Sequence, residues 1–134
     1  MDNLKGKKAL VVDDEETLRE LLVVQLSDRE VEALEASCAI EALELIEKQV
    51  IDFIISDVRM PNGDGVDLLK GLQEIPEDYR PEIVMMTGFA DLTEEEAMQM
   101  GALKIFAKPF RNKELFGFLN ENLKKPVKEE GSKD

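Results

Sequence analysis

Hydrophobic and polar positions follow one another along this chain as short apolar runs separated by longer amphipathic stretches. Five apolar runs are too short for helices and predict strands, and they cover residues 8–12, 31–36, 51–57, 83–86 and 104–107. After each run, apolar residues recur at three- and four-residue spacing, which is typical of a helix with one face on a core. The second run interleaves glutamates with apolar residues, as expected of a strand at the edge of a sheet.

Signals for helix ends accompany the amphipathic stretches. Ser37 and Asn112 are predicted N-caps, Thr93 begins a Thr-Glu-Glu-Glu capping box, and Gly101 is a suitable terminator. The residues expected on the inner faces of the helices are Leu18, Leu21, Leu22 and Leu26, then Ala39, Ala42, Leu43 and Ile46, then Leu68, Leu69 and Leu72, and finally Leu115, Phe116, Leu119 and Leu123.

Five strands that alternate with helices predict an α/β fold with a parallel sheet, right-handed crossovers and helices on both faces. The length of 134 residues suits one domain, which we expect over residues 1–125. Residues 126–134 are charged and lack apolar periodicity, so we expect a flexible C-terminal tail.

Composition narrows the function classes. The formal charge of −13 would repel nucleic acid and anionic lipid, so direct DNA binding is not expected. No apolar run approaches the roughly 20 residues that cross a bilayer, and we expect a cytoplasmic protein without membrane contact. The absence of histidine excludes His-based zinc sites and Ser-His or Cys-His triads. The single cysteine, Cys38, cannot form an internal disulfide and is expected to be a small core residue.

Four of the predicted strands end in a polar or charged residue. Asp13 and Asp14 follow the first strand, Asp57 ends the third, Thr87 follows the fourth and Lys108 follows the fifth. In a flavodoxin-like, doubly wound (βα)5 sheet with strand order 2-1-3-4-5, these four strands are adjacent and their ends converge on one crevice. The sequence therefore predicts a functional site at the carboxyl edge of the sheet.

The three carboxylates repel one another unless cations balance them, and one divalent ion plus Lys108 would do so. Oxygen ligands without histidine or cysteine point to Mg²⁺, or Mn²⁺ in its place, rather than zinc. Because Mg²⁺ commonly shares carboxylates with a phosphate, the site is predicted to receive a phosphoryl group, with Asp57 as the attacking carboxylate. The Thr87 hydroxyl and the backbone amides beside Arg59 and Gly88 would donate hydrogen bonds.

Four short motifs, taken together, resemble the receiver domain of bacterial two-component response regulators, in particular stand-alone chemotaxis-type regulators. The resemblance covers residues 6–125, and the motifs are residues 11–15, 56–61 with Gly65, 86–88 and 108–110. It implies that Asp57 is the phosphoacceptor, that Thr87 is the switch hydroxyl and that Lys108 contacts the phosphoryl group.

The resemblance also implies a ligand set for the metal and one special peptide bond. Asp13, Asp14, Asp57 and the backbone carbonyl of Arg59 would hold Mg²⁺. The bond between Lys108 and Pro109 is predicted to be cis, as it is in the family.

One position departs from the family pattern. The family has an aromatic residue three places before the lysine, where this chain has Ile105. Phe106 lies next to it, but successive strand residues face opposite sides, so its ring cannot take that place. In the family, the positions of Arg59 and Phe89 tune how fast water removes the phosphoryl group; the alternative is that both are solvated rim side chains.

The favoured function is a signalling module rather than a metabolic enzyme. It would take a phosphoryl group from a histidine of a sensor histidine kinase or phosphotransfer protein, catalyse its own phosphorylation and slow dephosphorylation, and change the face of its fourth helix, fifth strand and fifth helix for a downstream protein effector, or relay the group onward.

Several alternatives remain at this level. A Mg²⁺-dependent phosphohydrolase is the alternative, although Val58 and Arg59 stand where such enzymes have a second aspartate. Flavin binding is disfavoured by Asp13 and Asp14, which lie where a cofactor phosphate would sit. The sequence does not distinguish a stand-alone receiver from part of a larger protein, or a monomer from a phosphorylation-dependent dimer.

Overall fold

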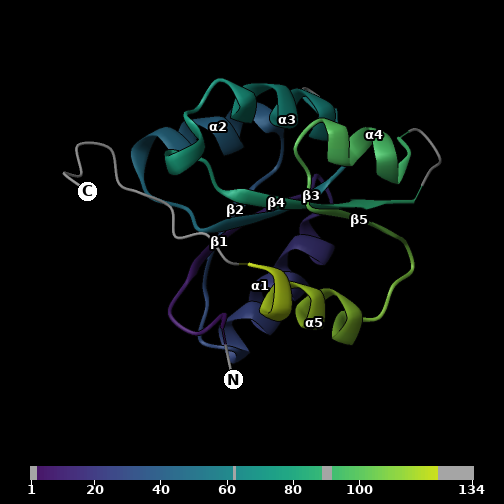
Figure 1. Cartoon of the computed structure of the whole chain (residues 1–134). Helices are drawn as coiled ribbons and strands as arrows, with labels where there is room; N and C mark the ends of the chain where they lie inside the picture. Colours follow the sequence, from purple (N-terminus) through teal and green to yellow (C-terminus); the bar gives the residue numbers. More distant parts are fainter. Residues whose placement is uncertain (1–2, 62, 89–91, 124–134) are drawn as a thin grey trace.

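The computed structural model describes residues 3–61, 63–88 and 92–123. Over these residues five strands alternate with five α-helices, with one short 3₁₀ turn before the fourth strand (Figure 1). The elements are β1 (Lys8–Val12), α1 (Glu16–Asp28), β2 (Glu32–Ala36), α2 (Ala39–Lys48), β3 (Phe53–Asp57), α3 (Gly65–Gln73), η1 (Glu77–Tyr79), β4 (Glu82–Thr87), α4 (Glu94–Gln99), β5 (Lys104–Ala107) and α5 (Asn112–Asn122).

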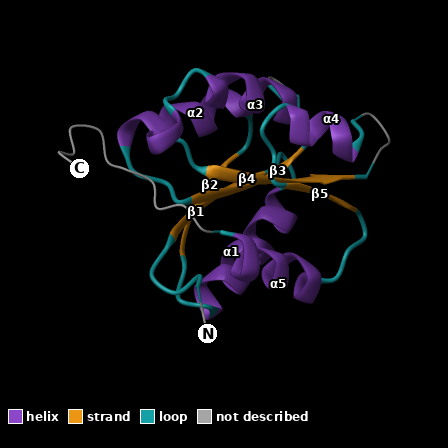
Figure 2. Ribbon diagram, viewed as in Figure 1, coloured by secondary structure: helices purple, strands orange, loops and turns teal. Residues whose placement is uncertain are grey.

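All five strands are parallel and form one sheet in the order β2-β1-β3-β4-β5, which confirms the predicted fold class. Helices α2, α3 and α4 cover one face of the sheet, and α1 and α5 cover the other (Figure 2). The register pairs Asp57 with Met86 and Thr87 with Ala107, so β3, β4 and β5 end close to one another. β2 lies at the edge, as its alternating glutamates predicted.

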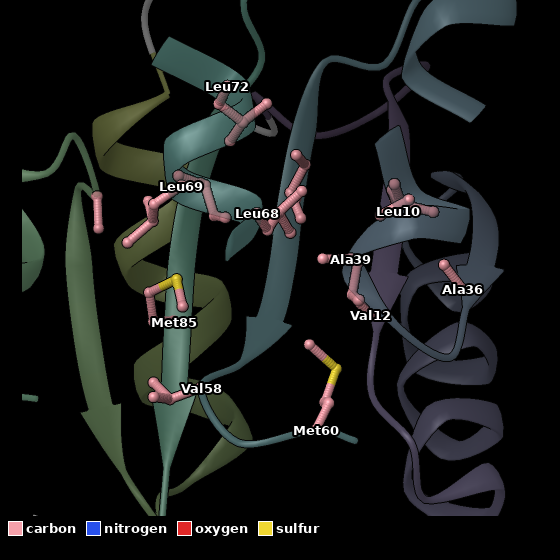
Figure 3. Packing of buried hydrophobic residues seen from close by; sticks show 14 of the residues in the cluster. Leu10, Val12, Ala36, Ala39, Val58, Met60, Leu68, Leu69, Leu72 and Met85 are labelled. Atoms are coloured by element: carbon pink, nitrogen blue, oxygen red, sulfur yellow. The ribbon is translucent and has the colours of Figure 1, made fainter. Parts of the chain in front are cut away.

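The two faces of the sheet bury separate hydrophobic cores because successive strand residues point to opposite sides. Figure 3 shows the core under α2 and α3, in which Leu68 and Leu72 of α3 belong to one cluster with the strand residues Leu10 of β1 and Met85 of β4. The opposite core lies under α1 and α5 and includes Phe53, whose side chain is fully buried.

The inner face of α1 differs from the prediction at one position. Leu22 and Leu26 are buried and Leu18 is half-buried, but Leu21 is 52% exposed. Neighbouring helix residues are about 100° apart around the axis, and on α1 the buried face is centred on Leu22 and Leu26, which leaves Leu21 at its exposed margin. The apolar stripe is therefore narrower than the run of leucines suggests. The expected inner faces of α3 and α5 are confirmed, since Leu68, Leu69 and Leu72 and then Leu115, Phe116, Leu119 and Leu123 are buried.

Two of the predicted helix caps are wrong. Cys38, half-buried, occupies the N-cap of α2, and its side chain makes no capping hydrogen bond with the described residues. Ser37 instead donates from its backbone N–H and its hydroxyl to Glu41 Oε1, at 2.8 and 2.9 Å. Asn112 is the first residue of α5 and the N-cap is Arg111, whose side chain likewise makes no capping hydrogen bond in the described part of the chain. In both cases the cap residue lies one place from the prediction.

The capping box at α4 and its terminator are confirmed. The Thr93 hydroxyl accepts a hydrogen bond from the Glu96 N–H at 3.0 Å, and the Glu96 carboxylate accepts from the Thr93 N–H at 3.1 Å. Gly101 follows the helix with φ of 108°, a backbone conformation that favours glycine.

The start and the end of the described fold are tied together. The Asn3 N–H donates to Asn120 Oδ1 at 2.6 Å, and Asn3 Nδ2 donates to the Leu123 carbonyl at 2.5 Å. Leu4 is buried in the core under α5. Within the described ranges, every helix is too short or too polar to span a bilayer, and the predicted tail at 126–134 lies outside those ranges.

Candidate functional site

Three aspartates meet at the carboxyl edge of the sheet, as the strand order predicted. Asp13 and Asp14 follow β1, and Asp57 is the last residue of β3. One carboxylate oxygen from each lies within 4.8 Å of the others. Asp13 and Asp57 are buried, whereas Asp14 is exposed. The cluster is therefore open on the Asp14 side and closed on the other.

The hydrogen bonding of the buried Asp13 carboxylate is incomplete among the described residues. Its Oδ1 accepts a hydrogen bond from the Glu15 N–H at 2.9 Å, but Oδ2 is buried and has no hydrogen-bond partner among the described residues. Burial raises the pKa of Asp13 above its ordinary 3.8; the Glu15 N–H lowers it, and the charge of Asp57 raises it again. A buried carboxylate oxygen of this kind suits a bound cation.

Lys108 connects β5 to the aspartates. Its Nζ lies 3.0 Å from Asp57 Oδ2 and 3.8 Å from Asp13 Oδ2. Its backbone N–H donates to the Thr87 carbonyl at 2.7 Å, which fixes the lysine against the end of β4. Thr87 itself is buried at that strand end, and the peptide bond between Lys108 and Pro109 is cis, as predicted.

In the turn after Asp57, the backbone at Gly65 comes back close to that of Asp57 and Val58. The Gly65 N–H donates to the Val58 carbonyl at 2.8 Å, and a Cβ on Gly65 would lie 2.7 Å from the Asp57 carbonyl oxygen and against the Met85 side chain. Only glycine fits there without a shift. Asp64 then caps α3 with its carboxylate, so the turn re-enters a helix immediately.

Arg59, Gly88 and Phe89 are the residues predicted at the rim of the site. Arg59 is exposed and lines an open pocket of about 350 Å³ together with Asp14, Met60, Pro61 and Asp64. Gly88 is exposed directly after β4. Phe89, predicted to tune phosphoryl loss, lies outside the described residues.

Ile105 and Phe106 face opposite sides of the sheet, as predicted. Ile105 belongs to the core under α2, α3 and α4. The Phe106 ring lies in the other core, with its centroid 5.7 Å from those of Phe110 and Phe118. Phe106 therefore does not occupy the place of the family's aromatic residue.

Sequence reasoning missed one residue that contacts the site. Arg19, on α1, donates from Nη1 to the Asp13 backbone carbonyl at 2.7 Å and from Nε to Glu35 Oε1 at 2.9 Å. No motif indicates this contact, because its acceptor is a backbone oxygen that every residue type possesses.

The donor set fits a hard divalent cation. The converging ligand atoms are carboxylate oxygens, Asp13 Oδ2 is buried without a hydrogen bond, and Lys108 balances only one of the three negative charges. Oxygen ligands of this kind favour Mg²⁺, Mn²⁺ or Ca²⁺ over zinc. We conclude that Asp13, Asp14 and Asp57 form a divalent-cation site, with the amine of Lys108 next to the buried Asp57 carboxylate.

Comparison with known proteins gives one consistent result. The family described as "Response regulator receiver domain" matches residues 9–120. The chain is 32% identical over 108 residues to sporulation initiation phosphotransferase F of Bacillus subtilis, covering 80% of this chain and 86% of that protein. It is 33% identical to the response regulator PilR of Pseudomonas aeruginosa but spans only 24% of that longer protein.

Solved structures agree with the sequence comparison. A response regulator from Burkholderia pseudomallei, described with a phosphorylated aspartic acid, a calcium ion and citrate, matches with a TM-score of 0.76 and 30% identity, over 87% of this chain and 68% of that one. TrrA of Thermotoga maritima, in complex with Mg²⁺-BeF, matches with a TM-score of 0.76 and 27% identity, over 86% and 97%. These matches favour a receiver over the alternative phosphohydrolase.

Proposed function

The chain belongs to the response regulator receiver domain family, and from this membership we propose that Asp57 accepts a phosphoryl group in a reaction that depends on Mg²⁺. The observation that carries the proposal is the site itself: Lys108 Nζ is 3.0 Å from Asp57 Oδ2, and Asp13, Asp14 and Asp57 offer oxygens within 4.8 Å of one another. We assign the receiver to residues 1–125, with 126–134 as its tail.

In the proposed reaction, a carboxylate oxygen of Asp57 attacks the phosphorus of a phosphohistidine. An O–P bond forms at Asp57 as the P–N bond of the donor breaks, and the departing imidazole keeps its electron pair and takes up a proton. The donor histidine lies outside these 134 residues, which contain none. A sensor histidine kinase or a phosphotransfer protein has the required chemistry.

Lys108 and the hydroxyl of Thr87 are proposed to stabilise the phosphoryl oxygens on Asp57, together with the backbone N–H groups beside Arg59 and Gly88. Asp13, Asp14, Asp57 and the Arg59 carbonyl would hold the cation, Mg²⁺ or Mn²⁺. The bound cation supplies charge neutralisation for the phosphoryl oxygens. Phosphorylation is thus assisted by the receiver's own residues, and slow hydrolysis, tuned by Arg59 and Phe89, reverses it.

We propose that the output is a change in the face formed by α4, β5 and α5. Thr87 lies at the end of β4 beside this face, and phosphorylation would draw its hydroxyl toward Asp57. Ile105 replaces the family's aromatic, so the change does not rely on a ring at that position. The partner is a downstream protein effector or a second phosphotransfer protein, in the cytoplasm, with the chain acting as a monomer or as a phosphorylation-dependent dimer.

Intact-mass measurement after incubation with Mg²⁺ and acetyl phosphate tests the proposal. The wild type is expected to gain one phosphoryl group that hydroxylamine removes, while Asp57→Asn gains none. Asp28→Asn, which removes one exposed carboxylate at the end of α1, is the matched control and should be modified like the wild type. Chelation of Mg²⁺ should abolish the gain.

Two results would count against the proposal. Modification of Asp57→Asn at the wild-type level would place the phosphoryl group elsewhere. Steady release of phosphate from acetyl phosphate at enzyme-like rates, without a modified protein, would instead indicate a phosphohydrolase.

A further inference from the structure

Arg19 joins the loop that carries Asp13 to the edge strand β2. Its guanidinium donates to the Asp13 carbonyl at 2.7 Å and to Glu35 Oε1 at 2.9 Å, and its side chain is only 16% exposed. The Asp13 N–H donates to the Ala36 carbonyl at 3.1 Å. The Asp13 peptide is therefore held on both sides through residues of β2, directly by Ala36 and through Arg19 by Glu35.

This attachment opposes the electrostatics of the site. Asp13 is buried within 4.8 Å of two other carboxylates, and one buried oxygen, Oδ2, has no hydrogen-bond partner among the described residues. Asp14 and Asp57 both repel the Asp13 carboxylate, and Lys108 Nζ, at 3.8 Å from Asp13 Oδ2, offsets only part of this repulsion. The hydrogen bonds that Asp13 makes with Arg19 and Ala36 involve its backbone. They therefore hold the loop without occupying the carboxylate.

We propose that Arg19 is a positioning residue for the cation site: with Glu35, it holds the Asp13 backbone so that the carboxylate stays turned toward Asp14 and Asp57. This inference rests on the proposed function, because it assigns Arg19 to the same cation. Arg19 does not contact the reacting atoms; it acts through the main chain of Asp13.

The direction of the change in cation affinity distinguishes a positioning role of Arg19 from a purely electrostatic one. Removing a positive side chain beside an acidic site makes the site more negative, so simple electrostatics predicts tighter cation binding in Arg19→Met. Loss of positioning predicts weaker binding, by roughly tenfold or more, as is typical when a residue that orients a metal ligand is removed. Lys70→Met, which removes one positive charge from an exposed position of α3, is the matched control.

Glu35 provides a second test that holds charge constant. Glu35→Gln and Glu35→Ala both remove one negative charge, but only glutamine keeps an oxygen that can accept from Arg19 Nε. Positioning through Glu35 predicts weaker cation binding in Glu35→Ala than in Glu35→Gln. Arg19→Lys keeps the positive charge but cannot donate to both acceptors in the same fork geometry, so its affinity should fall between those of the wild type and Arg19→Met.

The first readout is the Mg²⁺ dissociation constant from calorimetry, with no phosphodonor present. The second is acetyl phosphate labelling, in which Arg19→Met should need more Mg²⁺ for half-maximal rate yet approach the wild-type rate at saturating Mg²⁺. Urea unfolding of each variant checks that the fold is intact. If Arg19→Met does not fold, the comparison of Glu35→Ala with Glu35→Gln decides the question.

The outcomes keep the two proposals distinct. A wild type that neither binds Mg²⁺ nor is labelled contradicts the proposed function. A wild type that does both, beside an Arg19→Met variant that binds Mg²⁺ as tightly or more tightly, overturns the inference alone. Equal affinities of Glu35→Ala and Glu35→Gln overturn it as well.

Discussion

Replacing Asp13 by asparagine is expected to stabilise the protein when no divalent cation is present. The Asp13 carboxylate is fully buried and lies within 4.8 Å of oxygens of Asp14 and Asp57. An asparagine has nearly the same shape, its Oδ1 can still accept from the Glu15 N–H, and its Nδ2 can donate to a neighbouring carboxylate. The substitution therefore removes a buried charge without opening a cavity.

The size of the effect follows from the charges around Asp13. The Asp13 and Asp57 oxygens lie within 4.8 Å of each other, so at an effective dielectric constant of about 20 their repulsion is at least roughly 3.5 kcal/mol. Attraction to Lys108 at 3.8 Å is roughly 4 kcal/mol on the same basis, so these two terms nearly cancel. The cost of burying the charge remains, and we expect a net gain of about 1–2 kcal/mol in Asp13→Asn. For 134 residues this corresponds to a rise in Tm of about 4–7 °C.

Thermal unfolding with a chelator, and again with Mg²⁺, measures the effect. Without the cation, Asp13→Asn should melt above the wild type. At a Mg²⁺ concentration ten times its dissociation constant, the wild type should gain about 1.4 kcal/mol, whereas Asp13→Asn should gain much less because a ligand is missing. Asp28→Asn is again the control for loss of one carboxylate.

The pH dependence has a definite sign. The pKa of Asp13 is raised in the folded protein, so the folded state binds its proton more tightly than the unfolded state does. The penalty is complete above the raised pKa and disappears as the pH falls toward 3.8, so the advantage of Asp13→Asn should shrink on acidification. A lower Tm for Asp13→Asn in chelator at neutral pH would refute this reasoning.

Two matched pairs test the packing. Gly65→Ala should destabilise by about 1–3 kcal/mol, because its Cβ would meet the Asp57 carbonyl. Gly117→Ala within α5 meets no atom of the described residues within 4 Å and should stabilise by about 0.5–1 kcal/mol. Leu22→Ala should cost about 2–5 kcal/mol and Leu21→Ala less than about 0.5 kcal/mol. Urea unfolding checks both pairs, and equal losses for the two leucines would contradict the corrected face of α1.

The sequence predicts the meeting of the site residues because their positions depend on strand order alone. Asp13, Asp57, Thr87 and Lys108 each stand at or just after the end of a predicted strand, and parallel strands bring those ends to one edge. No side-chain detail is needed for that step. The alternation of side chains along a strand places Ile105 and Phe106 on opposite faces, as observed.

The features that the sequence did not predict depend on where individual side chains point, which can differ between neighbouring residues of similar chemistry. Leu21 and Leu22 are equally apolar, and only the packing of α1 shows which one is buried. Ser37 has the chemistry of an N-cap, yet its hydroxyl donates to Glu41 while Cys38 takes the cap position. The contact of Arg19 with the Asp13 carbonyl involves a backbone acceptor, which residue identity cannot reveal.

The hydrogen bonds from Asn3 to Asn120 and Leu123 have a practical consequence for handling the molecule. Helix α5 begins near Lys108 at the carboxyl edge and runs back along the sheet, so both ends of the described fold lie at the opposite edge (Figure 1). A biotin or an immobilisation tag attached directly at either end of the described residues would lie at the edge opposite Asp57 and orient it toward the solution. Biosensor measurements can therefore attach the molecule at residue 3 or after residue 123 without covering the acidic cluster.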